Sequence, residues 1–511
     1  TFSNTAAITI NDNGNASPYP SNINVTGVSS FTRMEVRLVG FSHTYPDDVD
    51  ILLVGPQGQR AILMSDAGDN FDVGSISFSF SQTATTPVPD STTLFQSSQP
   101  FRPGNYQNGP GVLTDTFPAP GPGVLTDAPA DLFVFNGTKP NGIWNLYVVD
   151  DAGTDVGSIA GGWTLTFTVP QIFTVTKTAD TNDGTCNADC SLREAITAAQ
   201  DGDLIQFSSL FDTPQTIDLL TALPDITRNI TIQGKGANLT TVRRAFNAAT
   251  DFRIFTIASG ITNGVAINGL TISNGRIVDE FGGGISSESL LFLNNVHVTG
   301  NHASGGGGGV SMEYVGGVFQ NCTFSNNFAG GAVGDGGGIS LSGGNGQFLR
   351  LINSTVTGNV SGDSVGGIAN SSFSGDSRLE IINSTIVNNK AVVSGGVETI
   401  TVGAGTTATT TLRNTIVTGN SPANLRAETS GGGPATIQTL GFNLSDNYNG
   451  VFTPLASDIT SATPRLAPLA NYGGQTPTHA FLHARPAVKA GGRSGQGVDQ
   501  RGVNRVVGAT A

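Results

Sequence analysis

The strongest pattern along the chain is a block of apolar and polar positions that returns five times between residues 293 and 420. Each copy has an apolar residue two places before an asparagine and another three places after it, as in Leu293, Asn295 and Val298. The asparagine recurs at steps of 26, 32, 30 and 31 residues, at Asn295, Asn321, Asn353, Asn383 and Asn414. Self-similarity at a period of ~20–50 residues is typical of a solenoid, a propeller or an array.

The phase of the pattern inside each block indicates which architecture is present. Side chains alternate along a strand with period two, so apolar or compact residues at −2, +1 and +3 cannot all face inward on one straight strand. The asparagine is therefore predicted at a corner between two short strands. Stacked coils would align the five asparagines at ~4.8 Å, so that each amide bonds the next in a structural ladder.

These features predict a right-handed parallel β-helix over residues 171–455. The alternative is a disordered tract rich in glycine and asparagine. The apolar columns stay in phase through loops of unequal length, which favours the β-helix.

Residues 1–170 carry a different pattern. Short runs with alternating apolar positions, such as Met34–Val39, Ser75–Phe80 and Trp144–Val149, are separated by loops rich in proline, glycine and aspartate. This alternation is typical of a β-sandwich or jelly roll. The sequence thus predicts an all-β protein with three regions: a β jelly roll over 1–170, the β-helix over 171–455 and a C-terminal tail of the β-helix over 456–511.

The first region resembles the P domain that follows the catalytic domain of subtilisin-like proprotein convertases. The matching stretches are Ser42–Pro56, Met64–Gly68, Pro140–Asp151 and Gly162–Thr166. The resemblance implies a β jelly roll, which in the convertases stabilises the protease. No protease domain precedes the module within this sequence, so we carry over the fold and not the convertase function.

The second region opens on Cys190-Ser191-Leu192-Arg193-Glu194-Ala195-Ile196. This run is similar, letter for letter, to the signature of a family of bacterial surface and secreted β-helix proteins with a pectate-lyase-like fold. The lead-in Asp183–Cys186 and the tail stretch Pro468–His479 also match the family. The resemblance implies a secreted, cell-surface protein with a β-helix, but the family has no single activity.

The local residues of this signature predict a short helix. Ser191 can cap its start, and Glu194 stands three residues later, as in a capping box. Leu192, Ala195 and Ile196 share one face. We expect the helix to cap the N-terminal end of the solenoid, whose open strand edges would otherwise pair with other chains.

Composition narrows the class of protein. Only 12% of the 511 residues are charged and the net charge is −14. The acidic balance argues against nucleic acid or an anionic membrane as a main partner. No apolar run reaches the length of a membrane span. The chain begins at Thr1 rather than at Met, and we expect a signal peptide or longer precursor before it.

The cysteines permit two interpretations. Cys186 and Cys190 are close enough in sequence to form a small disulfide in an oxidising compartment. They could also be half of a zinc site, although no histidine or second cysteine pair accompanies them. Cys322 occupies an inward column and is predicted to be an inert core thiol.

Aspartates cluster at three loop-to-strand junctions of the first region. Hard oxygen ligands crowded on loops suit calcium, which takes six to eight oxygens. The alternative is that they are solvated turn residues that cap strand ends. The predicted calcium ligands are Asp47, Asp48, Asp50, Asp66, Asp150, Asp151 and Asp155.

Many β-helices cleave polysaccharides, and these enzymes place carboxylates beside Arg, Lys or a metal. The outward position two after each repeat asparagine carries no acid. Scattered candidates could line a shallow groove near the second and third coils or belong to an ordinary polar loop. They are Asp279, Glu280, His297, His302 and Glu313.

The sequence therefore favours a non-enzymatic, extracellular structural or adhesive protein: a surface fibre, sheath or matrix component that associates with itself. A carbohydrate-active enzyme, or a carbohydrate-binding module of a secreted assembly, is the alternative. Fold alone cannot decide between them.

Overall fold

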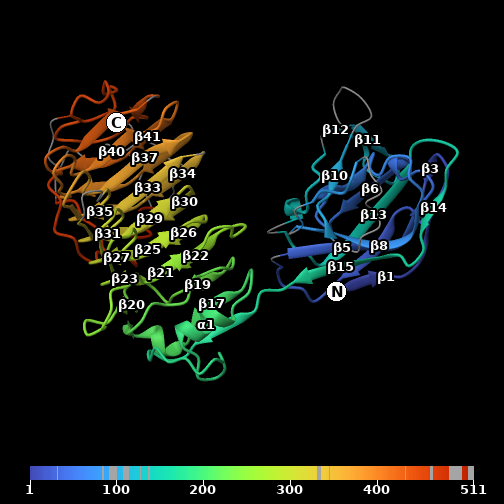
Figure 1. Ribbon diagram of the computed structural model, residues 1–511, viewed down its shortest axis with the longest axis horizontal. Helices are drawn as coiled ribbons and strands as arrows, with labels where there is room; N and C mark the ends of the chain where they lie inside the picture. The colour runs from blue at the N-terminus through green and yellow to red at the C-terminus, as the bar shows by residue number, and fades with distance from the viewer. Residues whose placement is uncertain are drawn as a thin grey trace. The chain divides into compact units, whose positions relative to one another are not determined.

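The computed structural model describes residues 1–31, 33–82, 84, 86–90, 100–106, 114–126, 128–135, 138–330, 335–344, 346–431, 433–460, 464–482 and 498–503. The chain forms two compact units, Thr1–Pro170 and Gln171–Ala511 (Figure 1). The predicted tail over 456–511 belongs to the second unit, and its residues 461–463, 483–497 and 504–511 lie outside the described residues. None of the described helices is long and apolar enough to cross a membrane.

The first unit contains two larger β-sheets and a hairpin. One sheet has the order β1-β15-β5-β14-β2, with β8 beside β5 and β9 beside β8. Its strands are β1 (Phe2–Asn4), β2 (Ile8–Ile10), β5 (Arg33–His43), β8 (Val73–Ser81), β9 (Pro100–Phe101), β14 (Gly157–Ile159) and β15 (Trp163–Thr168). The other has the order β10-β7-β6-β13-β3, with β4 beside β13. Its strands are β3 (Gly14–Asn15), β4 (Ser21–Val25), β6 (Val49–Val54), β7 (Arg60–Ser65), β10 (Gly104–Asn105) and β13 (Gly142–Asp150).

The hairpin pairs β11 (Thr114–Phe117) with β12 (Gly123–Thr126). The short 3₁₀ turns are η1 (Pro46–Asp48) and η3 (Leu132–Phe135).

Both sheets contribute to one hydrophobic core. Val36 and Leu165 come from the first sheet, Ile51 and Trp144 come from the second, and all four are buried in the same cluster. The alternating pattern of these strands places one row of apolar side chains inward on each sheet. The prediction of an all-β N-terminal unit is therefore confirmed, while the jelly-roll topology and the P-domain resemblance stay predictions.

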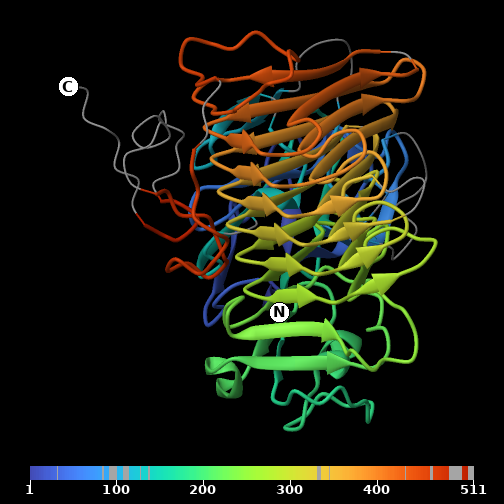
Figure 2. The same ribbon diagram turned by 90° about the vertical axis from the view of Figure 1, so that its left-hand side faces the viewer.

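The second unit is a β-solenoid whose coils stack strand upon strand (Figure 2). It contains one helix near its start, α1 (Leu192–Ala198), which follows the first strand, and a 3₁₀ turn, η4 (Ser209–Asp212). Its ten-stranded sheet contains β16 (Ile172–Val175), β17 (Leu204–Phe207), β19 (Thr231–Gln233), β22 (Val265–Asn268), β26 (Leu291–Asn294), β30 (Gly317–Gln320), β34 (Gln347–Ile352), β38 (Asp376–Ile382), β41 (Thr407–Arg413) and β44 (Ala435–Thr439). Its eight-stranded sheet contains β18 (Gln215–Leu219), β20 (Thr240–Arg244), β23 (Thr271–Ser273), β27 (His297–Thr299), β31 (Thr323–Ser325), β35 (Thr355–Thr357), β39 (Thr385–Val387) and β42 (Ile416–Thr418).

Two further parallel sheets complete the coils. The seven-stranded sheet contains β21 (Phe255–Ile257), β25 (Ile285–Ser287), β29 (Val310–Glu313), β33 (Ile339–Gly344), β37 (Ile368–Ser374), β40 (Val397–Thr401) and β43 (Leu425–Thr429). The four-stranded sheet contains β24 (Arg276–Ile277), β28 (His302–Ala303), β32 (Phe328–Ala329) and β36 (Val360–Ser361). Every strand pair recorded in these sheets is parallel and joins successive coils, as β26 joins β30. The parallel β-helix is therefore confirmed.

The five repeat asparagines lie between the strands of the ten-stranded and eight-stranded sheets. Their φ angles are 55° at Asn295, 55° at Asn321, 49° at Asn353, 53° at Asn383 and 50° at Asn414. This is the left-handed region, which asparagine tolerates better than other non-glycine residues. The asparagine therefore supplies the sharp corner that closes each coil.

The side chains of these corner asparagines make several kinds of hydrogen bond. Asn414 Nδ2 donates to Asn383 Oδ1 at 3.0 Å. Asn321 Nδ2 donates instead to Asn294 Oδ1 at 3.2 Å, and Asn353 Nδ2 donates to the Val498 carbonyl at 3.1 Å. The amide-to-amide contact expected of a ladder thus joins Asn383 and Asn414.

A continuous asparagine ladder lies six positions later in each block, as from 295 to 301. The Nδ2 of each member but the last donates to the Oδ1 of the asparagine in the next coil, at 2.9–3.0 Å. The Oδ1 of each member but the first also accepts the backbone N–H of the preceding ladder residue. The members are Asn301, Asn327, Asn359, Asn389 and Asn420, and all are buried.

The helix α1 stands at the start of the solenoid and has the predicted capping box. Ser191 Oγ accepts the Glu194 backbone N–H at 3.1 Å, and the Glu194 carboxylate accepts the Ser191 N–H at 2.7 Å. Leu192, Ala195 and Ile196 are buried in the solenoid core. The Cys186–Cys190 disulfide, present in the structure, closes the loop before the cap. Cys322 is a buried free thiol, and burial raises its pKa to about 12.

The C-terminal tail returns along the outside of the eight-stranded sheet. Gln500 Nε2 donates to the Cys322 carbonyl at 3.0 Å, and Gln500 Oε1 accepts from Thr355 Oγ1 at 2.8 Å. Thr476 Oγ1 donates to the Asn321 carbonyl at 2.9 Å. These contacts explain why Thr355, on an outward position, is only 1% exposed.

Candidate functional site

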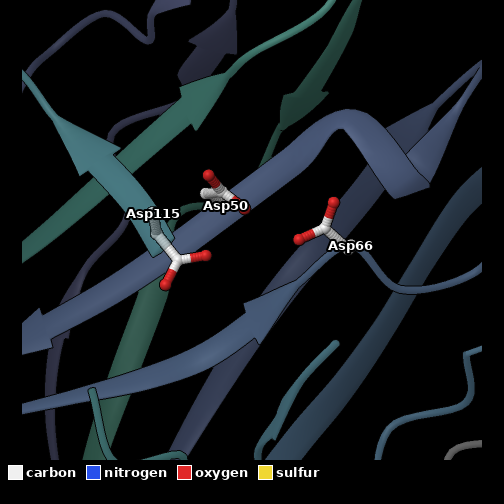
Figure 3. Close-up of side chains that lie close together, drawn as sticks. All are labelled: Asp50, Asp66 and Asp115. Carbon is white, nitrogen blue, oxygen red and sulfur yellow. The ribbon is translucent and has the colours of Figure 1, made fainter. Parts of the chain in front are cut away.

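Three aspartates of the first unit converge on one point. Asp50 lies on β6, Asp66 directly follows β7, and Asp115 lies on β11. One carboxylate oxygen from each lies within 4.8 Å of the other two. Figure 3 shows the three side chains gathered from separate strands. We name Asp50, Asp66 and Asp115 the carboxylate triad.

Strand pairing places the triad. Strands β6 and β7 are antiparallel, and Ile51 lies opposite Met64, so Asp50 and Asp66 reach the same end of the sheet. Asp66 has a φ of 46°, a left-handed conformation that turns the chain as β7 ends. Strand β10 runs parallel to β7 and brings Asn105 opposite Ser65.

Two neutral side chains hold Asp115 in the triad. Ser65 Oγ lies 2.6 Å from Asp115 Oδ1 and 3.0 Å from Asp66 Oδ2, and Asn105 Nδ2 donates to Asp115 Oδ2 at 3.1 Å. A serine hydroxyl carries one proton, so it can donate to only one of the two carboxylates at a time. The second carboxylate oxygen is therefore left facing another acceptor, which is an arrangement that a cation stabilises.

The electrostatics of the site are unfavourable for ionised carboxylates without a cation. Asp50 is 4% exposed, and neither Asp50 nor Asp115 forms an ion pair with a described lysine or arginine. Burial raises the pKa of Asp50 well above its usual value, and the carboxylates of Asp151, Asp115 and Asp66 raise it further, against a lowering by Ser65. Burial likewise raises the pKa of Asp66 to about 6. Desolvation and like charges both oppose ionisation, and a divalent cation would offset both.

A second, separate feature points to a ligand at the same place. Asn105 Oδ1 is buried and has no hydrogen-bond partner, although the Nδ2 of the same amide is bonded to Asp115. A buried acceptor without a partner costs about 1–3 kcal/mol. Carboxylate and amide oxygens are the ligands that Ca²⁺ takes, at about 2.3–2.6 Å. The donor set of the triad with Asn105 therefore fits calcium.

The structure brings together two of the predicted calcium ligands, Asp50 and Asp66. Asp150 instead faces His43, with its Oδ2 at 3.1 Å from Nε2, and Asp155 accepts from Thr44 Oγ1 at 2.7 Å. The three remaining predicted ligands lie nearby, on η1 and directly after β13: Asp47, Asp48 and Asp151. Burial and neighbouring carboxylates raise the pKa of Asp48 to about 6 and also raise that of Asp151.

Sequence reasoning missed Asp115. It stands alone among Thr114, Thr116 and Phe117, and 49 positions separate it from Asp66 (115 − 66). Its only local signal is that an aspartate, a poor strand former, occupies an inward position of an alternating strand, where it is 4% exposed.

The predicted groove residues of the β-helix do not form one cluster. His297 is half-buried with its Nε2 2.8 Å from Ser325 Oγ, and desolvation of the ring lowers its pKa to about 4. His302 stacks on Phe328, with 5.0 Å between ring centroids. Glu280 pairs with Arg253, while Asp279 takes a left-handed φ of 59° in the same loop.

Glu313 differs from these residues because its ionisation is perturbed. It ends strand β29, and burial raises the pKa of its carboxyl. The carboxylates of Glu288 and Glu280 raise this pKa further, and Arg253 lowers it. Glu280, Glu313 and Arg253 therefore share one electrostatic neighbourhood.

Comparisons with known proteins add the following. No protein-family model matches the sequence, and no curated protein matches it. Among solved structures, the chain is similar to pectate lyase Pel9A, with 13% identity and a TM-score of 0.33 over 57% of this chain and 74% of that one. It is also similar to the Agl-KA catalytic domain, with 12% identity and a TM-score of 0.25 over 89% of this chain and 91% of that one. The β-helix itself rests on the strand pairing described above.

Proposed function

We propose that this chain is an extracellular structural protein in which a calcium-binding β-unit is carried by a β-helix rod. The observation that carries the calcium proposal is the carboxylate triad. Three aspartates from three strands meet within 4.8 Å, and a buried amide oxygen without a partner lies beside them. Calcium bound there would neutralise the like charges of the three carboxylates. It would also connect β11 to the end of the β6–β7 strand pair.

The surface of the β-helix supports the structural part of the proposal. Strand β41 presents an outward row of neutral polar side chains, Thr407, Thr409 and Thr411, and the positions that stack on them in β38 are the charged Asp376, Arg378 and Glu380. Only 12% of the residues are charged, so the density of charge is low, while the net charge of −14 makes association depend on ionic strength. Rigid solenoids with flat, weakly charged faces can associate end to end or side by side.

Calorimetric titration of the full chain tests the calcium site. Protein stripped with EDTA is titrated with CaCl₂, alone and as the Asp115→Asn variant. We expect one class of site in the wild type and at least a tenfold weaker affinity in Asp115→Asn, a loss of about 1.4 kcal/mol or more. Asp72→Asn, an exposed aspartate of the same unit, is the control and should bind as the wild type does. Equal affinities in all three proteins would refute the site.

Electron microscopy of the secreted protein tests the structural role. Ordered filaments or sheets would support self-association, and their loss after chelation would assign a role in assembly to calcium. Dispersed single particles with and without calcium would contradict self-association while leaving the calcium titration to decide the metal site.

One observation favours a second candidate function, a carbohydrate-active enzyme. A glycosidase needs a general acid whose pKa is raised, and burial together with the carboxylates of Glu288 and Glu280 raises the pKa of Glu313, while Arg253 lowers it. Polysaccharide turnover by the wild type that is lost in Glu313→Gln would support this candidate. Turnover that survives Glu313→Gln, or no turnover on any polysaccharide, would exclude Glu313 as its acid.

A further inference from the structure

We infer that the first unit contains a pocket that binds a sugar residue of a neutral saccharide. The pocket has a volume of about 440 Å³, within the ~300–1,000 Å³ range of small-molecule sites. Its walls combine two prolines and Ala130 with the side chains of Arg102, Asn105, Tyr106 and Asp131. The pocket adjoins the carboxylate triad, because Asn105 lines the pocket and also donates to Asp115.

The pocket walls are held by specific contacts. Arg102 N donates to the Thr86 carbonyl at 2.7 Å, and Val88 N donates to the Arg102 carbonyl at 2.8 Å. The Tyr106 hydroxyl donates to the Val88 carbonyl at 2.6 Å, which fixes the ring. A Cβ at Gly104 would lie 2.9 Å from that ring, so the glycine permits the ring to pack closely. The site is therefore preformed.

The polar groups of the pocket are not fully used by the protein. Among the described residues, none forms an ion pair with the Arg102 guanidinium. Asp131 Oδ1 accepts the Phe133 N–H at 2.8 Å, and the structure records no hydrogen bond to Oδ2 from the described part of the chain. The pocket thus offers a fork of donors from Arg102 and a carboxylate oxygen from Asp131.

The charges near the pocket narrow the ligand class. Arg102 lowers the pKa of Tyr106 while Asp90 raises it, so charges of both signs lie close to the pocket. A ligand with a full charge of either sign would be attracted by one sign of these side chains and repelled by the other. An apolar ligand would displace water from the Arg102 and Asp131 side chains without replacing its hydrogen bonds. A neutral pyranose fits because its hydroxyls donate and accept, while its C–H face can pack on Tyr106 and the prolines.

Calorimetry with the full chain and defined oligosaccharides tests this inference. The probes are cellotetraose, xylotetraose and mannotetraose, with trigalacturonate as an anionic comparison, each titrated with calcium and after chelation. We expect at least one neutral tetrasaccharide to bind with a Kd of ~1 mM or tighter. Arg102→Gln should weaken that binding at least tenfold, and Ala130→Trp, which fills the pocket, should abolish it.

Matched controls separate the pocket from other sites. Arg60→Gln removes an exposed arginine from β7 of the same unit and should leave binding unchanged. Arg102 is itself exposed, so Arg102→Gln should fold, and the melting temperature checks this. The inference is overturned if no neutral tetrasaccharide binds up to ~10 mM. It is also overturned if only trigalacturonate binds, or if both pocket variants bind as the wild type does.

Discussion

Replacing Asn359 with alanine should destabilise the β-helix more than any exposed asparagine substitution. Asn359 is 0% exposed at the centre of the asparagine ladder. Its Oδ1 accepts Asn327 N at 3.0 Å and Asn327 Nδ2 at 2.9 Å. Its Nδ2 donates to Asn389 Oδ1 and to the Phe324 carbonyl, both at 2.9 Å. Alanine removes all four hydrogen bonds.

The size of this destabilisation depends on which polar groups lose their hydrogen-bond partners. Asn327 Nδ2 keeps the Val298 carbonyl, and Asn389 Oδ1 keeps the Asn359 backbone N–H. The Asn327 backbone N–H loses its acceptor, Asn359 Oδ1, and a buried unsatisfied donor costs about 1–3 kcal/mol. The three other lost bonds contribute about 0.5–1.5 kcal/mol each. We therefore expect Asn359→Ala to lower the free energy of unfolding by about 3–7 kcal/mol.

Urea unfolding followed by far-UV circular dichroism measures the loss. The two tryptophans, Trp144 and Trp163, both belong to the first unit, so their fluorescence reports that unit separately and should not change. The control is Asn268→Ala on the outward side of β22, expected within ~0.5 kcal/mol of the wild type. If Asn359→Ala cost no more than Asn268→Ala, the ladder would not stabilise the coils as we argue.

Three further perturbations have defined outcomes. Because burial raises the pKa of Asp48 and Asp66 to about 6, above the ordinary value of 3.8, the calcium-free first unit should lose stability as the pH rises from about 4 to 6. Tryptophan-detected melting in EDTA should show this decrease, calcium should remove it, and a flat curve in EDTA would contradict the argument. Ser191→Ala should lower the free energy of unfolding of the solenoid by about 1 kcal/mol by removing the cap of α1, measured in urea against Thr197→Ala. Gln500→Ala should speed proteolytic cleavage of the C-terminal tail, because the Gln500 side chain forms hydrogen bonds with Cys322, Thr323, Thr355 and Thr476. The control Gln438→Ala should leave the cleavage rate unchanged. Equal cleavage rates in the two variants would show that other contacts hold the tail.

The β-helix could be predicted from sequence because its signal is repeated. Each coil has the same spacing of apolar positions around its asparagine, so a wrong boundary in one loop does not change the predicted strands of the other coils. The corner position and the ladder position were harder to separate, since both hold asparagine in every block. Only the structure shows that Asn295 has a φ of 55° while Asn301 bonds Asn327.

The candidate metal site could be predicted only in part because its residues are brought together by tertiary structure. Asp47, Asp48 and Asp50 are close in sequence, but Asp47 and Asp48 lie on the 3₁₀ turn η1 and only Asp50 lies on β6. Asp50 points inward on β6, and its partners come from β7 and β11. Asp115 gave no sequence signal comparable to the acidic clusters, because a lone aspartate on a strand is common on protein surfaces.

X-ray diffraction from crystals grown with calcium, with anomalous data that identify the element, tests the central claim most directly. We predict one calcium peak between Asp50, Asp66 and Asp115, with carboxylate oxygens at about 2.3–2.6 Å and the Asn105 amide oxygen turned toward the ion or its water. A calcium-saturated crystal without a peak at the triad, or with calcium bound only elsewhere, would contradict the account.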